Sequence, residues 1–174
     1  MLTLSLLRHA KSAWDDPGLD DFERGLAPRG IKMAPEVGKY LKRQKLVPDL
    51  VICSGAVRAR ATLALILPEF GAPAPEIQYD DDIYLAHPAA LVDVVKKIAD
   101  GPQHVVLIGH NPGIHALALE LTGSGDRQAL AELATKFPTA ALAVLTFGAA
   151  HWRDIKAGSG RLEQFVTPRK IGDR

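Results

Sequence analysis

Leu2-Thr-Leu-Ser-Leu-Leu-Arg-His9 is a short apolar run that ends in a basic pair. Such a run, bounded by charge, predicts a buried strand and places His9 at its carboxyl end. Two further runs have the same form and each leads to a basic side chain, Leu50–Cys53 to Arg58 and Val105–Gly109 to His110. Because ligands bind at the carboxyl edge of open α/β sheets, these side chains are expected to meet in one crevice.

Strand-like and helix-like patterns alternate along most of the chain. Arg29–Lys45 carries the apolar stripe of an amphipathic helix, and Gly123–Gly125 is expected to close a later helix. The last two strand-like runs, Ala141–Phe147 and Arg161–Thr167, show no helix between them, so an antiparallel pair at one sheet edge is expected. These patterns predict an α/β fold in one domain over residues 1–174. The expected architecture is a three-layer α/β/α sandwich with a mostly parallel mixed sheet and an antiparallel edge strand.

The composition excludes several classes of protein. The 174 residues suit one domain, and a formal net charge of +1 provides no basic field that would gather nucleic acid or bind a membrane surface. No apolar stretch reaches the ~20 residues that span a bilayer, and the first residues lack the basic region of a secretory signal. The single cysteine, Cys53, excludes an internal disulfide and fits a reducing compartment. A cytoplasmic monomer without nucleic-acid or membrane partners is therefore expected.

Two histidines and two arginines at one edge are suited to a phosphoryl group. A neutral imidazole has a free lone pair at physiological pH, so His9 is the candidate nucleophile. Arg8 and Arg58 are expected to clamp the phosphoryl oxygens in bidentate geometry, and His110 to donate to the same oxygens in the transition state. A pocket with this much positive charge needs no magnesium, and no cofactor is expected. Since His9 must be neutral while His110 donates, a bell-shaped pH dependence is expected.

Three motifs, in this order along the chain, resemble those of the histidine phosphatase superfamily, the phosphoglycerate mutase-like proteins. They are Leu7-Arg-His-Ala-Lys-Ser12, Ser54-Gly-Ala-Val-Arg-Ala-Arg-Ala-Thr62 and Val106-Leu-Ile-Gly-His-Asn-Pro-Gly113. The compact length and the Phe137-Pro-Thr139 segment look most like the small SixA-type phosphohistidine phosphatases. The resemblance extends from Met1 to about Thr167. It implies a phosphoglycerate mutase-like fold and a catalytic core of Arg8, His9, Arg58 and His110.

Other residues near these motifs are candidate substrate contacts. Glu23-Arg-Gly-Leu-Ala-Pro-Arg-Gly30 is similar to the Arg-Pro-Leu-x-x-x-Gly segment of SixA-type proteins, with glycine in place of proline after Arg24. Arg24 is therefore either a phosphate contact or an exposed loop arginine. Trp14 either forms part of the mouth of the site or packs. The remaining candidate substrate contacts follow the two histidines: Lys11, Ser12 and Asn111.

The proton donor is the weakest part of the pattern. Many members of the superfamily carry a glutamate after the third strand, whereas this chain has Asp80-Asp-Asp82, in which Asp82 is the closest positional match. Tyr84 either packs or donates. An alkoxide needs a well-placed acid in order to leave, whereas a phosphoramidate nitrogen leaves readily once it is protonated. The sequence therefore favours hydrolysis of protein-borne phosphohistidine through a covalent phosphohistidine intermediate on His9.

Two alternatives remain open. The first is a broad-specificity phosphomonoesterase of small phosphorylated substrates. The chain has no long insertion that would form a deep lid, and a shallow site favours a phosphohistidine-bearing protein while still permitting activated esters. The second is a non-catalytic phosphoprotein-binding module, against which the intact nucleophile argues. The six histidines lack the spacing of a metal site, so a metal-independent phosphatase is expected.

Overall fold

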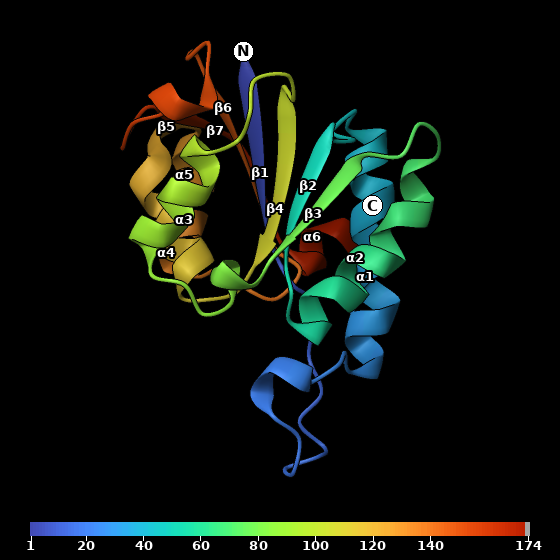
Figure 1. Cartoon of the computed structure of the whole chain (residues 1–174). Coiled ribbons are helices and arrows are strands. Elements are labelled where there is room, and N and C mark those ends of the chain that lie inside the picture. Colours follow the sequence, from blue (N-terminus) through green and yellow to red (C-terminus); the bar gives the residue numbers. More distant parts are fainter. Residues whose placement is uncertain (173–174) are drawn as a thin grey trace.

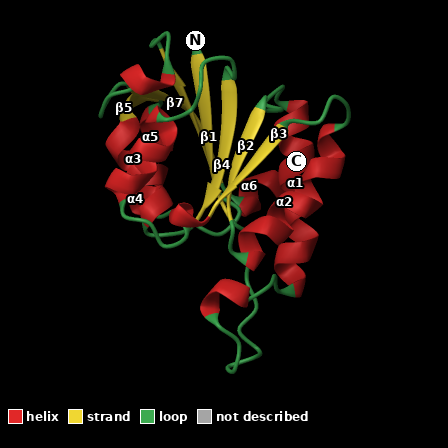
Figure 2. Ribbon diagram, in the orientation of Figure 1, coloured by secondary structure: helices red, strands yellow, loops and turns green. Residues whose placement is uncertain are grey.

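The computed structural model describes residues 1–172, in which one seven-stranded sheet lies between two layers of helices (Figure 1). One layer consists of α1 (Pro28–Arg43), α2 (Val57–Phe70) and α6 (Pro168–Gly172). The other consists of α3 (Pro88–Lys96), α4 (Gly113–Leu121) and α5 (Arg127–Thr135), and Figure 2 shows both layers in red. Short 3-10 helices lie in the loops: η1 (Asp21–Glu23), η2 (Asp81–Ile83) and η3 (Trp152–Asp154). The predicted three-layer α/β fold is confirmed.

The strands follow the order β3-β2-β4-β1-β6-β7-β5. Their bounds are β1 Leu2–Arg8, β2 Leu50–Ser54, β3 Glu76–Asp80, β4 His104–Gly109, β5 Thr122–Gly125, β6 Leu142–Phe147 and β7 Gly160–Val166. Only β6 runs against its neighbours, since it pairs antiparallel with both β1 and β7 while every other described pair is parallel. The sheet is therefore mixed and mostly parallel, as expected.

The central strands β2, β4 and β1 are covered by helices on both faces, which explains their nearly continuous apolar sequences. Successive side chains of a strand point to opposite faces, so each strand feeds two cores. Leu6 packs with residues of α3 and α4, whereas Leu7 packs with residues of α1 and α2. Cys53 lies in the second of these cores, and burial raises the pKa of its thiol to about 12. It is therefore a packing residue and not a reactive thiol.

Of two expectations about the last third of the chain, one is wrong and the other is confirmed in its strand pairing but not in its place in the sheet. Gly123–Gly125 belongs to β5, which forms the sheet edge beside β7. Its glycines allow a close approach of two backbones, because a Cβ on Gly123 would lie 1.8 Å from the carbonyl oxygen of Gly158. The predicted antiparallel pair does form between β6 and β7, but β6 also pairs with β1 and so lies inside the sheet. The reversed strand is thus internal and not at the edge.

Residues 1–172 contain neither a candidate membrane span nor a cluster of metal-ligating side chains. No helix within residues 1–172 is long and apolar enough to cross a bilayer. No group of three or more histidine, cysteine, aspartate or glutamate side chains in the same range is arranged to hold a metal ion. The cytoplasmic location, the monomeric state and the absence of a cofactor stay predictions.

Ser5, buried in the middle of β1, forms a hydrogen-bonded pair with His104, which is half-buried at the start of β4. Ser5 Oγ lies 2.8 Å from His104 Nε2, and burial lowers the pKa of His104 to about 4. The histidine of an unfolded chain has a pKa near 6.5, so below that pH the unfolded chain binds a proton that the native state does not bind. We therefore expect this residue's contribution to stability, on the order of 1–3 kcal/mol, to be complete above pH 6.5 and to be lost between pH 6.5 and 4.

The measurement is urea unfolding at several pH values for the wild type and His104→Gln. Because His9 and His110 also have lowered pKa values, the wild type should lose stability steeply on acidification. The variant should be less stable at pH 7 and less sensitive to acid, since glutamine does not titrate. Identical slopes for the two proteins would contradict the assignment.

Candidate active site

The three strand ends that carry the predicted site lie next to each other, in the order β2-β4-β1. In this register Arg8 is opposite Gly109, and Cys53 is opposite Ile108. A cavity of about 430 Å³ opens at this edge of the sheet. Its lining contains Arg8, His9, Lys11, Ser12, Trp14, Asp21, Arg24, Arg58, Leu85, His110, Asn111 and Thr139. The structure therefore brings together all the predicted site residues except Asp82.

The His9 ring is held in one orientation by the backbone carbonyl of the next residue, Ala10. Nδ1 lies 2.7 Å from the carbonyl oxygen of Ala10, which can only accept, so Nδ1 carries the proton and Nε2 keeps its lone pair. The ring is 5% exposed, and this burial, with Arg58 and Arg8 nearby, lowers its pKa to about 4. His9 is thus neutral at physiological pH, as a nucleophile must be.

His110 faces His9 across the cavity, with ring centroids 5.0 Å apart. Its Nε2 lies 2.7 Å from Ser54 Oγ, while Nδ1 is buried without a hydrogen-bond partner. Burial is the main cause that lowers the pKa of His110 to about 3, followed by His9 and Arg58. Both histidines are therefore uncharged near neutral pH.

Four buried side-chain polar atoms of the described residues have no hydrogen-bond partner, and all four belong to residues that line this cavity. They are Arg8 Nε, Arg58 Nε, His110 Nδ1 and Asn111 Oδ1. Native proteins pair nearly all such atoms, so a cluster of exceptions indicates groups that a ligand completes. Three of the four are nitrogens, which suits a ligand with several oxygen atoms.

Asp21 of η1 is a central residue of the cavity that sequence reasoning missed. Its carboxylate accepts hydrogen bonds from Arg24 Nε at 2.9 Å, from Arg58 Nη2 at 3.0 Å and from the Tyr84 hydroxyl. The bond from Tyr84, followed by those from Arg24 and Arg58, lowers the pKa of Asp21 to about 2 despite its partial burial. Asp21 thus remains ionised and orients both guanidinium groups. The one available signal was its position three residues before Arg24 in a charged loop.

Arg24 is a buried member of the site and not an exposed loop residue. It is 8% exposed, its Nη1 donates to Ser12 Oγ at 3.0 Å, and its guanidinium lies 3.5 Å from the centroid of the Trp14 ring. Trp14 itself is 71% exposed at the mouth of the cavity, so it both stacks on Arg24 and faces solvent. The segment from Lys11 to Arg24 is tied to the start of α1, since the Ala27 N–H donates to the Lys11 carbonyl oxygen at 2.9 Å and a Cβ on Gly30 would lie 2.2 Å from the same oxygen.

The segment before β6 also reaches the site. Arg8 Nη1 and Asn111 Nδ2 both donate to the carbonyl oxygen of Phe137, at 3.1 and 2.9 Å. Thr139, two residues later, lines the cavity. Asn111 therefore ties the loop after His110 to this segment, while its Oδ1 stays without a partner.

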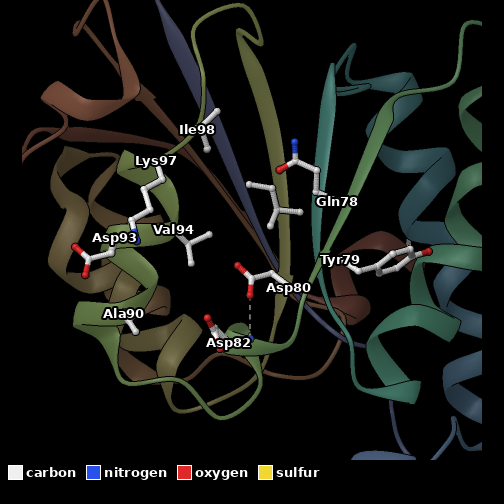
Figure 3. A pocket seen from close by; sticks show the side chains of 10 residues that line it. Gln78, Tyr79, Asp80, Asp82, Ala90, Asp93, Val94, Lys97 and Ile98 are labelled. Atoms are coloured by element: carbon white, nitrogen blue, oxygen red, sulfur yellow. Dashed lines mark hydrogen bonds between the residues drawn. The ribbon is translucent and has the colours of Figure 1, made fainter.

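Asp82 lies outside the cavity, contrary to its expected role. It lines a separate groove of about 540 Å³ between β3 and α3, together with Asp80 and Asp93 (Figure 3). Asp80 accepts from the Asp82 backbone N–H at 2.9 Å and so fixes the turn that directs Asp82 into the groove. Tyr84 comes closer, since its ring lies edge-on to His110 with centroids 5.4 Å apart and its hydroxyl donates to Asp21.

Comparisons with known proteins find a family model and a relative that this chain resembles. Residues 4–83 match the family model of the histidine phosphatase superfamily, branch 1. An uncharacterized protein of Mycobacterium tuberculosis is 40% identical over 165 residues, which cover 94% of this chain and all of that protein.

Two solved structures resemble this chain over nearly its whole length. A protein from Agrobacterium tumefaciens, assigned as the phosphohistidine phosphatase SixA, is 32% identical with a TM-score of 0.81, covering 96% of this chain and 98% of that one. A second protein with the same assignment, from Nakamurella multipartitia, is 28% identical with a TM-score of 0.81, and 96% of each chain is covered.

The different positions of Asp21 and Asp82 lead to a prediction. Asp21→Asn weakens the ion pairs that orient Arg24 and Arg58, so it should lower kcat/KM for a phosphorylated substrate by about 10- to 100-fold, as the loss of an orienting partner does elsewhere. The matched variant Asp82→Asn should change kcat/KM by less than about twofold, since surface changes have small effects. A large loss in Asp82→Asn with none in Asp21→Asn would reverse the assignment.

Proposed function

The chain belongs to the histidine phosphatase superfamily, as a phosphatase of the SixA type, and we propose that its substrate is phosphohistidine carried by a protein. The proposal rests on one observation. The residues that line the cavity include the neutral His9, the two arginines Arg8 and Arg58, and one carboxyl group, that of Asp21, which is ionised. This combination supplies a nucleophile and charge compensation but no carboxylic acid. These groups suit a reaction in which the phosphoryl group passes to the His9 nitrogen and the leaving group departs without a strong acid.

In the first step, His9 Nε2 attacks the phosphorus atom in line with the bond that breaks. A bond forms between Nε2 and phosphorus, the P–N bond of the substrate breaks, and its electron pair goes to the departing imidazole nitrogen. Arg8 and Arg58 bind the equatorial oxygens as charge shifts among them, and His110 donates to the same oxygens. The product is a phosphohistidine on His9.

In the second step, water attacks the phosphorus of phosphorylated His9. The new P–O bond replaces the P–N bond, the electron pair returns to Nε2, and the water proton passes to the phosphate product or to solvent. The hydrogen bond from Nδ1 to the Ala10 carbonyl holds the ring in place through both steps. Inorganic phosphate leaves and the neutral ring is regenerated.

The leaving group distinguishes this substrate from an ordinary phosphate ester. An alkoxide is strongly basic and requires a positioned acid, whereas an imidazole nitrogen leaves as a neutral ring once phosphohistidine has been protonated from solvent. Asp21 cannot serve as that acid near neutral pH because its pKa is about 2. The chemistry of the cavity thus favours P–N over P–O cleavage.

The shape of the mouth supports a protein as the carrier. Trp14 and Leu85 line the cavity and expose 71% and 58% of their surfaces. Leu85 has a φ of +49°, a conformation that leucine rarely adopts and that tends to persist at functional positions. An open rim with exposed apolar side chains suits a phosphorylated side chain presented on another protein. The same opening admits aryl phosphates, so a small-molecule phosphomonoesterase activity remains the alternative.

A substrate panel tests the proposal. A phosphohistidine peptide or protein should be hydrolysed with kcat/KM at least about 100-fold above that for sugar phosphates, since these lack an easily protonated leaving nitrogen. His9→Ala should abolish turnover and the phosphorylated adduct that rapid acid-free quenching traps on the wild type. Activity should persist in chelator, because no step uses a metal. Faster turnover of sugar phosphates would overturn the substrate assignment.

The pH profile provides a separate check. Because burial lowers the pKa of His9 to about 4 and that of His110 to about 3, both rings are neutral from weakly acidic to weakly basic pH. A neutral imidazole still carries one N–H, so His110 remains a donor. We therefore replace the bell-shaped expectation by one in which His9 and His110 add no inflection to kcat/KM between pH 6 and 7, so that any change there follows the separately measured titration of the substrate, and the His9 lone pair is lost only as pH drops toward 4. An inflection between pH 6 and 7 that the titration of the substrate does not account for would contradict these assignments.

A further inference from the structure

Ser54, the last residue of β2, is fully buried directly behind His110. Its Oγ has two partners, the backbone N–H of Ala56 at 3.2 Å and His110 Nε2 at 2.7 Å. The proposed mechanism uses His110 as a donor but does not specify which ring nitrogen carries the proton. The hydrogen-bond partners of Ser54 determine which nitrogen of His110 carries the proton.

The donors and acceptors around Ser54 favour one tautomer of His110. The Ala56 N–H can only donate, so it occupies a lone pair of the serine oxygen. If His110 Nε2 also carried a proton, the serine hydroxyl proton would have no acceptor and the lone pair on Nδ1 would be buried without a donor. If the hydroxyl instead donates to Nε2, the single group left unpaired is an N–H at Nδ1. Each unpaired buried polar group is costly, so the second arrangement prevails.

We propose that Ser54 is a positioning residue that fixes His110 as the Nδ1–H tautomer, so that the neutral ring presents an N–H to a phosphoryl oxygen in the cavity. This inference rests on the proposed function for the identity of the acceptor. It accounts for the unpartnered Nδ1, which belongs to a residue that lines the cavity. The lowered pKa of His110 supports it, because only a neutral imidazole has a tautomer to set.

The two catalytic rings then differ only in their hydrogen-bond partners. At His9 a backbone carbonyl accepts from Nδ1, which leaves a lone pair at Nε2 for attack. At His110 a serine hydroxyl donates to Nε2, which leaves a proton at Nδ1 for donation. One neutral imidazole thus becomes a nucleophile and the other a hydrogen-bond donor without any charge on either ring.

The direct test is nitrogen NMR of the ligand-free wild type labelled with ¹⁵N-histidine, with the His110 signals assigned by their loss in His110→Gln. We expect a protonated Nδ1 and an unprotonated Nε2 at neutral pH. A proton on Nε2, or a cationic ring, would overturn the inference. Because no substrate is present, this outcome is independent of whether phosphohistidine is the substrate.

The functional test compares Ser54→Ala with a matched serine elsewhere in the fold. Ser54→Ala should shift His110 toward the Nε2–H tautomer and lower both orthovanadate affinity and kcat/KM by about 10- to 100-fold, as the loss of a partner that orients an active-site histidine does. Ser5→Ala removes a partly buried serine–histidine hydrogen bond of nearly the same length, 2.8 Å, which joins the middle of β1 to the start of β4. It should lower the melting temperature while leaving the His110 tautomer and vanadate affinity unchanged.

The outcomes separate the inference from a general loss of structure. Equal losses of vanadate affinity in both serine variants would show that stability, not the tautomer, is responsible. Unchanged vanadate affinity in folded Ser54→Ala would also overturn the proposal. If Ser54→Ala does not fold, the wild-type ring signals decide by themselves. A correct tautomer with no phosphohistidine turnover would reject the substrate and leave the role of Ser54 intact.

Discussion

The site depends on the parallel pairing of three adjacent strands, β2, β4 and β1, whose carboxyl ends lie side by side. The backbone ladder fixes Arg8 opposite Gly109 and continues one residue beyond the strands, where the His9 N–H donates to the Gly109 carbonyl at 3.2 Å. Two histidines that are far apart in sequence are thereby held 5.0 Å apart by main-chain hydrogen bonds. Side-chain positions in such a site follow from the scaffold and require little adjustment.

Charge is concentrated at this edge in a protein that is nearly neutral as a whole. Three arginines line one cavity, and two of them share the carboxylate of Asp21. Burying several cations together is costly, and the partners that compensate them also fix their geometry. The two histidines avoid the same cost by remaining neutral. The cavity thus combines strong local attraction for an anion with few unpaired charges of its own.

The sequence predicts the central strands and the catalytic core because each strand is an uninterrupted apolar run followed by a specific motif. It does not predict the role of Asp21, since a loop carboxylate has no periodic signal and its partners come from α2, from the residue after η1 and from the residue after η2. The position predicted for Asp82 is wrong because its turn depends on a hydrogen bond from its own backbone N–H to the Asp80 side chain. β5 is missed because four residues with two glycines carry no strand pattern.

The reversed direction of β6 has a consequence for how the site is connected. A strand that runs against its neighbours brings its beginning to the edge where they end, so the turn before β6 supplies the Phe137 carbonyl to Arg8 and Asn111. The Ala140 N–H reaches the carbonyl oxygens of both Arg8 and His9. Changes in the length of this turn would therefore disturb the catalytic residues, whereas the connection from β6 to β7 leaves from the opposite edge and contributes Trp152 and Ile155 to the core there.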